Sequence, residues 1–342
     1  MFATYTNPAD SELIYRIIRA SMSNIWALPV HPGFLNRNSQ PMQLTNGPGS
    51  YDAAVPSRDG KRVFAIGKRN RGELVRFDMR TKQFVPFMGG ISAIDPTFSR
   101  DGQWVADTLS ADHTSWRSRA NGTLRLQLTY PPMEVSFPSI SPDGEDVSFF
   151  TPDHENYVVS LDGGSPRKVD LNTANSTCMS PTESAIVFTE ITFATSPGKT
   201  GFNLKVLDPQ SGTIGLVPSS QGIFGGFLLG QGKLVAAKGD SSKLCSALTA
   251  DIGLSWFLAR SQNRVPSPAG RYLYYATRGD DPQTMIRLAD RHVETITSLK
   301  NLHRVVDNVD GTTQIGVAPD ASPIFTRDLS TQKIYALAVK WP

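Results

Sequence analysis

A four-residue signature recurs three times at a constant interval, and no other feature of the chain constrains its fold as strongly. The copies are Ser57-Arg58-Asp59-Gly60, Ser99-Arg100-Asp101-Gly102 and Ser141-Pro142-Asp143-Gly144, each 42 residues after the one before and each followed by an apolar run. Repeats of this length, made of several short strands between turns, are typical of β-propellers, in which each repeat forms one blade. The sequence therefore predicts an all-β propeller with four-stranded blades of about 42 residues.

The Asp-Gly pair explains why the signature recurs. Asp can hydrogen-bond the nearby backbone, and Gly adopts a positive φ without strain, so the pair closes a tight hairpin between the first two strands of a blade. We therefore interpret Asp59, Asp101 and Asp143 as architectural residues and not as catalytic carboxylates.

The same rhythm extends beyond these three copies in both directions. Later units lose the Asp-Gly pair but keep the succession of apolar strands and polar loops. We expect one propeller domain over 1–342 with eight repeat units, near 1–45, 52–87, 94–129, 136–169, 176–217, 224–257, 264–298 and 309–342.

The two ends of the chain are compatible with two ways of closing the ring. Segments 13–18, 25–30 and 42–45 match the second to fourth strands of a first blade, whereas the last unit stops after three strands. One arrangement is an eight-bladed ring with a three-stranded last blade. The alternative is a seven-bladed ring closed by strand exchange, in which 42–45 completes the last blade. We favour eight blades, because seven would leave 13–18 and 25–30 as a hairpin with an open edge, which natural sheets avoid.

Composition and charge exclude some classes of partner. With 34 Lys and Arg against 31 Asp and Glu, the net charge is only +3, so we expect no nucleic-acid partner. The first residues form no signal region, and no apolar stretch is long enough to span a membrane. As written, the chain is expected to be cytoplasmic, and it would be periplasmic if it were the extracytoplasmic part of a longer tethered protein.

Several short segments resemble the TolB-like, WD40-like propeller repeat. They are Asn24-Ile25-Trp26-Ala27-Leu28-Pro29, Gln43-Leu44-Thr45, Arg71-Gly72-Glu73-Leu74-Val75-Arg76, Trp116-Arg117-Ser118-Arg119 and Gln127-Leu128-Thr129. The ending, Thr326-Arg327-Asp328 through Gln332-Lys333-Ile334-Tyr335-Ala336-Leu337, resembles the C-terminal propeller of bacterial proteins that join a winged-helix DNA-binding domain, one membrane helix and an extracytoplasmic propeller. The resemblance implies a sensor or scaffold. The chain as given has no winged helix, so a role in transcription is not carried over.

The usual catalytic signatures are not found in the sequence. There is no G-x-S-x-G elbow, and His154-Glu155-Asn156-Tyr157-Val158 has Val158 where a zinc-protease helix has its second histidine. We assign no catalytic residue, no cofactor and no metal ligand.

One set of polar residues remains as a candidate binding face. Loops between the second and third strands of the blades open on one face of a propeller, and an Asp-His pair occurs in two adjacent units. Imidazole beside carboxylate could bind a divalent metal or act as acid and base near neutral pH, although hydrated loops carry such residues too. The candidate residues are Arg69, Arg71, Asp112, His113, Asp153, His154, Arg278 and Asp280.

We therefore expect a monomeric, non-enzymatic sensor or scaffold module that presents a polar loop face to a protein, peptide or glycan ligand. The alternative is a propeller enzyme, a metal-assisted lyase or hydrolase acting on a carbohydrate or small ester, in which His113 and His154 would converge on one metal.

Overall fold

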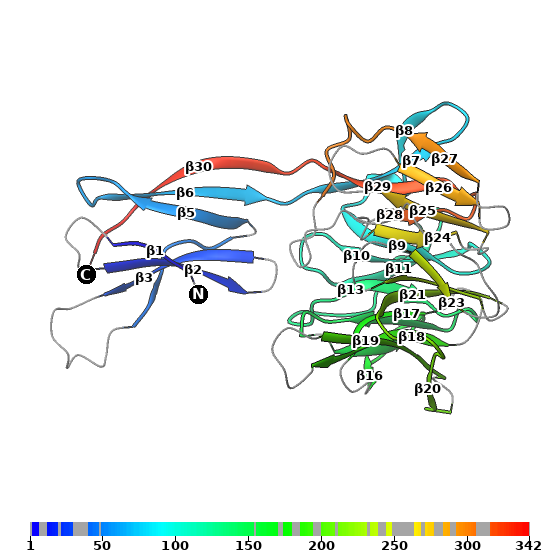
Figure 1. Ribbon diagram of the computed structural model, residues 1–342. Coiled ribbons are helices and arrows are strands. Elements are labelled where there is room, and N and C mark those ends of the chain that lie inside the picture. The colour runs from blue at the N-terminus through cyan, green and yellow to red at the C-terminus, as the bar shows by residue number, and fades with distance from the viewer. Residues whose placement is uncertain are drawn as a thin grey trace. The chain divides into compact units, whose positions relative to one another are not determined.

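The computed structural model is all-β, with one short 3₁₀ turn at Met88–Gly90. It describes residues 2–6, 12–19, 22–29, 40–47, 49–153, 155–169, 174–179, 185–193, 200–208, 211–230, 233–238, 244–247, 263–267, 271–276, 283–287, 292–305 and 315–341. Within these ranges the strands form eight small sheets, and no helix is long and apolar enough to cross a bilayer. The chain forms two compact units (Figure 1).

The first unit comprises Met1–Gly72, Ser110–His113 and Asp328–Pro342. One of its sheets has the order β1-β2-β3-β4, formed by Phe2–Thr6, Glu12–Arg19, Met22–Pro29 and Met42–Gln43. The other has the order β30-β6-β5, formed by Thr331–Ala338, Arg62–Arg69 and Ser50–Pro56. All strand pairs are antiparallel.

The core of the first unit lies between its two sheets. Alternation along β6 turns Val63 and Ala65 inward, where they pack with Ile14, Ile25 and Ala54, and all five side chains are 0–1 % exposed. At about 25 cal/mol per Å² of apolar surface removed from water, this burial is the main force that holds the two sheets together.

The second unit comprises Glu73–Leu109 and Thr114–Arg327 and contains six sheets. The first three have the orders β12-β11-β10-β9 (Leu126–Gln127, Ser115–Arg119, Trp104–Leu109, Ala93–Phe98), β13-β14-β15-β16 (Ser136–Ile140, Asp146–Phe150, Asn156–Ser160, Arg167–Val169) and β17-β18-β19-β20 (Ala174–Met179, Ile186–Phe193, Thr200–Leu207, Ile214–Leu216). The others have the orders β21-β22-β23 (Ile223–Gly230, Lys233–Lys238, Leu244–Ala247), β24-β25-β26-β27 (Asn263–Pro266, Tyr272–Ala276, Gln283–Arg287, Val293–Thr297) and β28-β29-β7-β8 (Ile315–Val317, Pro323–Asp328, Gly72–Asp78, Gln83–Pro86).

Most neighbouring sheets of the second unit contact one another, as blades of a propeller do. β9 contacts β13, β14 contacts β17, and β18 contacts β21. The mixed sheet β28-β29-β7-β8 contacts β24 on one side and β9 on the other. Each junction buries an apolar cluster, for example Ala106, Val135, Ile140, Val147 and Phe149 between the sheets of β10 and β14. A single repeat could not bury both of its faces alone, so stacking supplies the core.

Two sheets combine strands in a way that the repeat does not predict. The expected unit near 52–87 contributes β5 and β6 to one sheet and β7 and β8 to another. The expected unit near 309–342 is divided likewise, with β28 and β29 beside β7, and with β30 beside β6. The connections that would close hairpins, Asn70–Arg71 and Leu329–Ser330, instead lead from one sheet into the next. The closure of all eight sheets into one ring stays a prediction.

The signature turns have the architecture predicted for them. In the second copy, the Ser99 hydroxyl accepts a hydrogen bond from Trp104 N (2.9 Å) and donates to Asp101 Oδ1 (2.5 Å), while Gly102 has φ of 70°. The bonds of Ser57 and Ser141 repeat this pattern. These residues are occupied in closing the hairpins, which confirms their structural role.

Candidate functional site

The connection between β6 and β7 carries two of the predicted binding residues. Arg69 and Arg71 are both exposed. The main chain of Arg71 is fixed, because its N–H donates to Ser330 Oγ (3.1 Å) and its carbonyl accepts from Leu329 N–H (2.8 Å). The arrangement therefore presents guanidinium groups to solvent from a held backbone.

The Asp112-His113 pair lies in the turn that joins β10 to β11. Leu109 N–H donates to the Thr114 carbonyl (2.8 Å) and closes this turn. His113 has φ of 53° and is only 7 % exposed, whereas Asp112 is half-buried. A left-handed backbone is uncommon for residues other than Gly, but His tolerates it better than most. The turn Ser110–His113 belongs to the same compact unit as Arg69 and Arg71.

The other four candidates either belong to the second unit or lie outside the described residues. Asp153 is exposed, lies between β14 and β15, and belongs to the second unit. His154, Arg278 and Asp280 lie outside the described residues. Over the described part of the chain, no group of three or more His, Cys, Asp or Glu side chains is placed to hold a metal ion. A common binding face for all eight residues therefore stays a prediction.

Glu155, two residues after Asp153, is part of a local ion-pair cluster. Its carboxylate accepts hydrogen bonds from Lys168 Nζ (2.5 Å) and Tyr157 OH (2.9 Å). The Lys168 ammonium, followed by the Tyr157 hydroxyl, lowers the pKa of Glu155. This carboxylate is thus held in its charged form as an acceptor.

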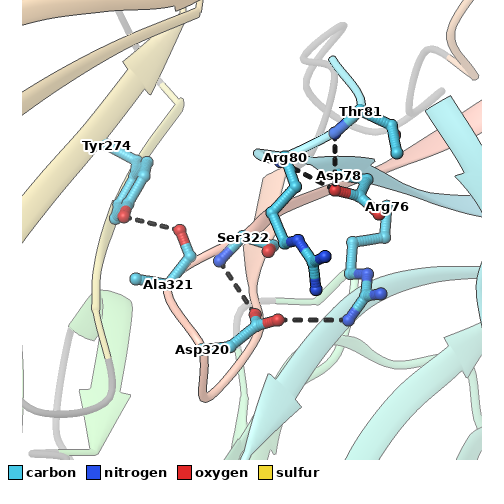
Figure 2. A network of polar contacts seen from close by, with 8 residues as sticks. All are labelled: Arg76, Asp78, Arg80, Thr81, Tyr274, Asp320, Ala321 and Ser322. Carbon is cyan, nitrogen blue, oxygen red and sulfur yellow. Dashed lines mark hydrogen bonds and ion pairs between the residues drawn. The ribbon is translucent and has the colours of Figure 1, made fainter. Parts of the chain in front are cut away.

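A second polar network in the second unit was not expected from the sequence. It centres on the turn between β28 and β29, and Figure 2 shows its side chains. Asp320 Oδ2 accepts from Arg76 Nη1 on β7 (3.1 Å), and Asp320 Oδ1 accepts from Ser322 N–H (3.0 Å). On the other side of the turn, the Tyr274 hydroxyl on β25 donates to the Ala321 carbonyl (2.7 Å), and burial raises the pKa of Tyr274.

The turn after β7 adds a carboxylate and a further arginine. Asp78 Oδ1 accepts from the backbone N–H groups of Arg80 (2.8 Å) and Thr81 (3.0 Å), and Figure 2 shows the Arg80 side chain extending toward the Asp320 turn. The bond from Thr81, followed by that from Arg80, lowers the pKa of Asp78. The turn is thereby ordered, with Arg80 exposed.

This network joins strands from distant parts of the sequence. Asp320 stands where the signature has its Asp, and Ala321, with φ of 66°, stands where it has Gly. That correspondence identifies the turn, but the repeat does not predict that Arg76 would bind it, because the repeat places β7 in another blade. Tyr274 gave no signal, since it reads as one of several apolar residues in a strand. The network connects β7 and β25 to the turn between β28 and β29.

A buried ion pair lies within the sheet of β9 to β12. Asp107 on β10 is 0 % exposed and accepts two hydrogen bonds from Arg125 (2.7 and 2.8 Å), whose guanidinium stacks 4.9 Å from the Trp116 ring centre. Burial raises the pKa of Asp107, and Arg125 opposes that rise. Because Asp107 is fully buried and its carboxylate is occupied by Arg125, we assign the pair a structural role.

Comparison with known proteins supports the fold. No family model matches the chain, and no curated protein matches it. Among solved structures, a putative TolB from Agrobacterium tumefaciens is similar with a TM-score of 0.50 and 16 % identity, covering 76 % of this chain and 99 % of that one. A chain from a nidogen/laminin complex is similar with a TM-score of 0.50 and 11 % identity, covering 69 % and 95 %. The chain therefore has a β-propeller fold, as the repeat predicted, and the fold is TolB-like, as the resemblance implied.

Proposed function

We propose that this chain is a non-enzymatic propeller module that binds a protein or peptide through exposed basic loop residues. The observation that carries the proposal is the pair Arg69 and Arg71. Their guanidinium groups are exposed, and the main chain beside them is held by Leu329 and Ser330. Charge-assisted hydrogen bonds from arginine to carboxylate are strong, and a held backbone lowers the entropy lost on binding. The ligand would therefore carry carboxylates.

The turn with Asp112 and His113 would limit what can approach these arginines. It belongs to the same unit, and its half-buried carboxylate and buried imidazole give it a defined shape. We propose that this turn contributes shape and specificity, whereas the arginines contribute charge. The fold is compatible with such a role, since one similar chain comes from a complex of two proteins.

We propose in addition that the mixed sheet β28-β29-β7-β8 closes the six sheets of the second unit into a ring of their own, as an alternative to the eight-bladed ring predicted from the repeat. Its support is close contact on both sides. On the β9 side, the Thr326 hydroxyl donates to the Ala93 carbonyl (2.7 Å), and on the β25 side Tyr274 donates to Ala321. A sheet that combines strands from both ends of a domain connects the first and last blades of that domain.

Binding of a labelled octaglutamate peptide, measured by fluorescence polarisation at low salt, tests the proposed function. The doubly reversed variant Arg69→Glu/Arg71→Glu should bind about tenfold more weakly or worse, because two exposed guanidinium groups become carboxylates. Arg80→Glu, an exposed arginine in the second unit, is the matched control and should change affinity less than about twofold. Absence of binding, or an equal loss in the control, would contradict the proposal.

A further inference from the structure

The sheet β30-β6-β5 has three strands, as β21-β22-β23 has, whereas the other described sheets have four. In the sheets of β9 to β12 and β13 to β16, a fourth strand pairs with the outer side of the third. β30 occupies the third position beside β6, and no strand in the described part of the chain pairs with its outer edge. A whole row of backbone donors and acceptors is therefore offered at this edge.

The two edges of this sheet differ in how well they could accept another strand. β5 is interrupted by a bulge at Ala53, which has φ of 49°, and ends at Pro56. β30 pairs with β6 without interruption from Thr331 opposite Arg69 to Ala338 opposite Arg62. It contains no proline and a single charge, Lys333. Bulges, prolines and charges are the usual protection of edges, so β5 is protected and β30 is much less so.

β30 is held firmly from its inner side. Gly67 on β6 leaves room for the Tyr335 ring, which meets Tyr51 edge to face at 5.7 Å between ring centres. Beyond the strand, Trp341 Nε1 donates to the Gly60 carbonyl (2.6 Å). A partner strand would therefore add to a template that is already ordered, which reduces the entropy cost of binding.

An apolar surface continues from this edge across the sheet. Ile334, 77 % exposed, lies opposite Ile66, and Phe64, 38 % exposed, lies between Ala336 and Val55. The counterpart of Phe64 one repeat later is Ala106, which is 0 % exposed because the next blade covers it. Within the described residues, the face of the sheet that carries Phe64 and Ile334 is therefore not covered by a neighbouring sheet as its counterpart is.

The charges around this surface indicate the chemistry of the cover. Arg62 stands at one end of β6, and Lys68 and Arg69 stand at the other. The acidic residues of this sheet region are engaged elsewhere, since Asp59 accepts from Ser57 and Asp52 pairs with Arg16. A second copy of this chain would bring the same basic ends together. An acidic segment would complement them.

We propose that the outer edge of β30 binds an extended segment of a partner protein as a fourth strand, with alternating apolar residues in its middle and acidic residues at both ends. Backbone hydrogen bonds to β30 supply affinity, Ile334 and Ala336 contact the apolar residues, and Lys68, Arg69 and Arg62 contact the acidic ends. The inference rests on the proposed function, because Arg69 belongs to both surfaces.

The probe is a labelled peptide whose middle segment repeats the pair Val-Thr four times. Two glutamates precede this segment and two follow it. Fluorescence polarisation should show that it binds the full chain more tightly than octaglutamate does. Methylation of alternate backbone nitrogens in the probe should abolish its higher affinity relative to octaglutamate. Ile334→Glu should weaken binding of the probe about tenfold, because an apolar contact is replaced by a charge of the same sign as the probe. The affinity for octaglutamate should fall much less.

Leu216→Glu is the matched control, since Leu216 is 61 % exposed on β20, another outer strand. It should leave the affinity within about twofold. If octaglutamate binds but the strand peptide shows no advantage, the strand site is wrong and the proposed function stands. If neither peptide binds, both are wrong. A dimer by sedimentation that Ile334→Glu dissociates would instead assign the edge to a second copy.

Discussion

At the scale of single residues, the signature turns show how hydrogen bonding by Ser and Asp, together with the positive φ of Gly, selects a short motif. The hydroxyl of Ser99 bonds both Trp104 N–H and the Asp101 carboxylate, and Asp101 also accepts from Gln103 N–H (3.0 Å). The Ser99 hydroxyl, followed by the Gln103 N–H, lowers the pKa of Asp101, and Ser141 does the same for Asp143. The Ser hydroxyl and the Asp carboxylate of the motif therefore accept hydrogen bonds from the backbone N–H groups of the hairpin.

These hydrogen bonds predict how the free energy of unfolding changes with pH in the acid range. A carboxyl whose pKa is lowered in the folded state stabilises it fully above its unfolded value of about 3.9, and this contribution is lost as pH falls through the lowered native pKa. The stability difference between the native chain and Asp101→Asn, measured by urea unfolding, should therefore be present at about pH 5 and shrink toward about pH 2.

The Ser99→Ala background provides the control for that experiment. Since the Ser99 hydroxyl is the largest cause of the lowered pKa of Asp101, its removal should reduce the pH dependence of the Asp101→Asn difference. A difference that stays constant across this range in both backgrounds would show that the carboxylate does not act through these bonds.

At the scale of elements, close backbone approach holds the mixed sheet to its neighbour. A Cβ at Gly316 on β28 would lie 2.6 Å from Pro96 Cγ and 2.8 Å from the Pro96 carbonyl oxygen on β9. One of these atoms belongs to the backbone, so the contact cannot be relieved by a rotamer change. The absence of a side chain is therefore required for these two strands to pack.

Gly316→Ala should accordingly lower the free energy of unfolding of the second unit by about 1–3 kcal/mol. Gly215→Ala on β20 is the matched control, because a Cβ there would meet no atom within 4 Å, and its effect should stay within about 0.5 kcal/mol. Equal effects of the two substitutions in chemical denaturation would mean that β28 does not approach β9 as described.

The sequence predicted the elements far better than it predicted their partners. The period, the signature turns and the four-strand order of most sheets follow from local alternation and turn chemistry. The exchange of β7 and β30 does not follow from these local features. Each of the two is the apolar third strand of its repeat, and each comes after a two-residue connection. Either can pair with β6 or β29, and only long-range packing decides. The Arg76 to Asp320 contact was missed for the same reason.

At the scale of the whole molecule, one chain produces two compact units by sharing strands between its first and last repeats. β6 of the first unit continues into β7 of the second, and β29 of the second continues into β30 of the first. The proposed strand site follows from this exchange, since β30 brings no fourth strand with it. If the exchange did not occur, the mixed sheet would disappear, and β7 and β8 would complete the sheet of β5 and β6.

The most direct test of the exchange is disulfide trapping in a background of Cys178→Ser and Cys245→Ser. Phe64 pairs with Ala336 in the structure, whereas the register of the next repeat, in which Ala106 pairs with Arg117, would pair Phe64 with Val75. Directly opposed residues of antiparallel strands are close enough to form a disulfide. Phe64→Cys/Ala336→Cys should therefore cross-link under mild oxidation, as peptide mass mapping would show, and Phe64→Cys/Val75→Cys should not. The reverse result would place β7 beside β6 and contradict the exchanged sheets.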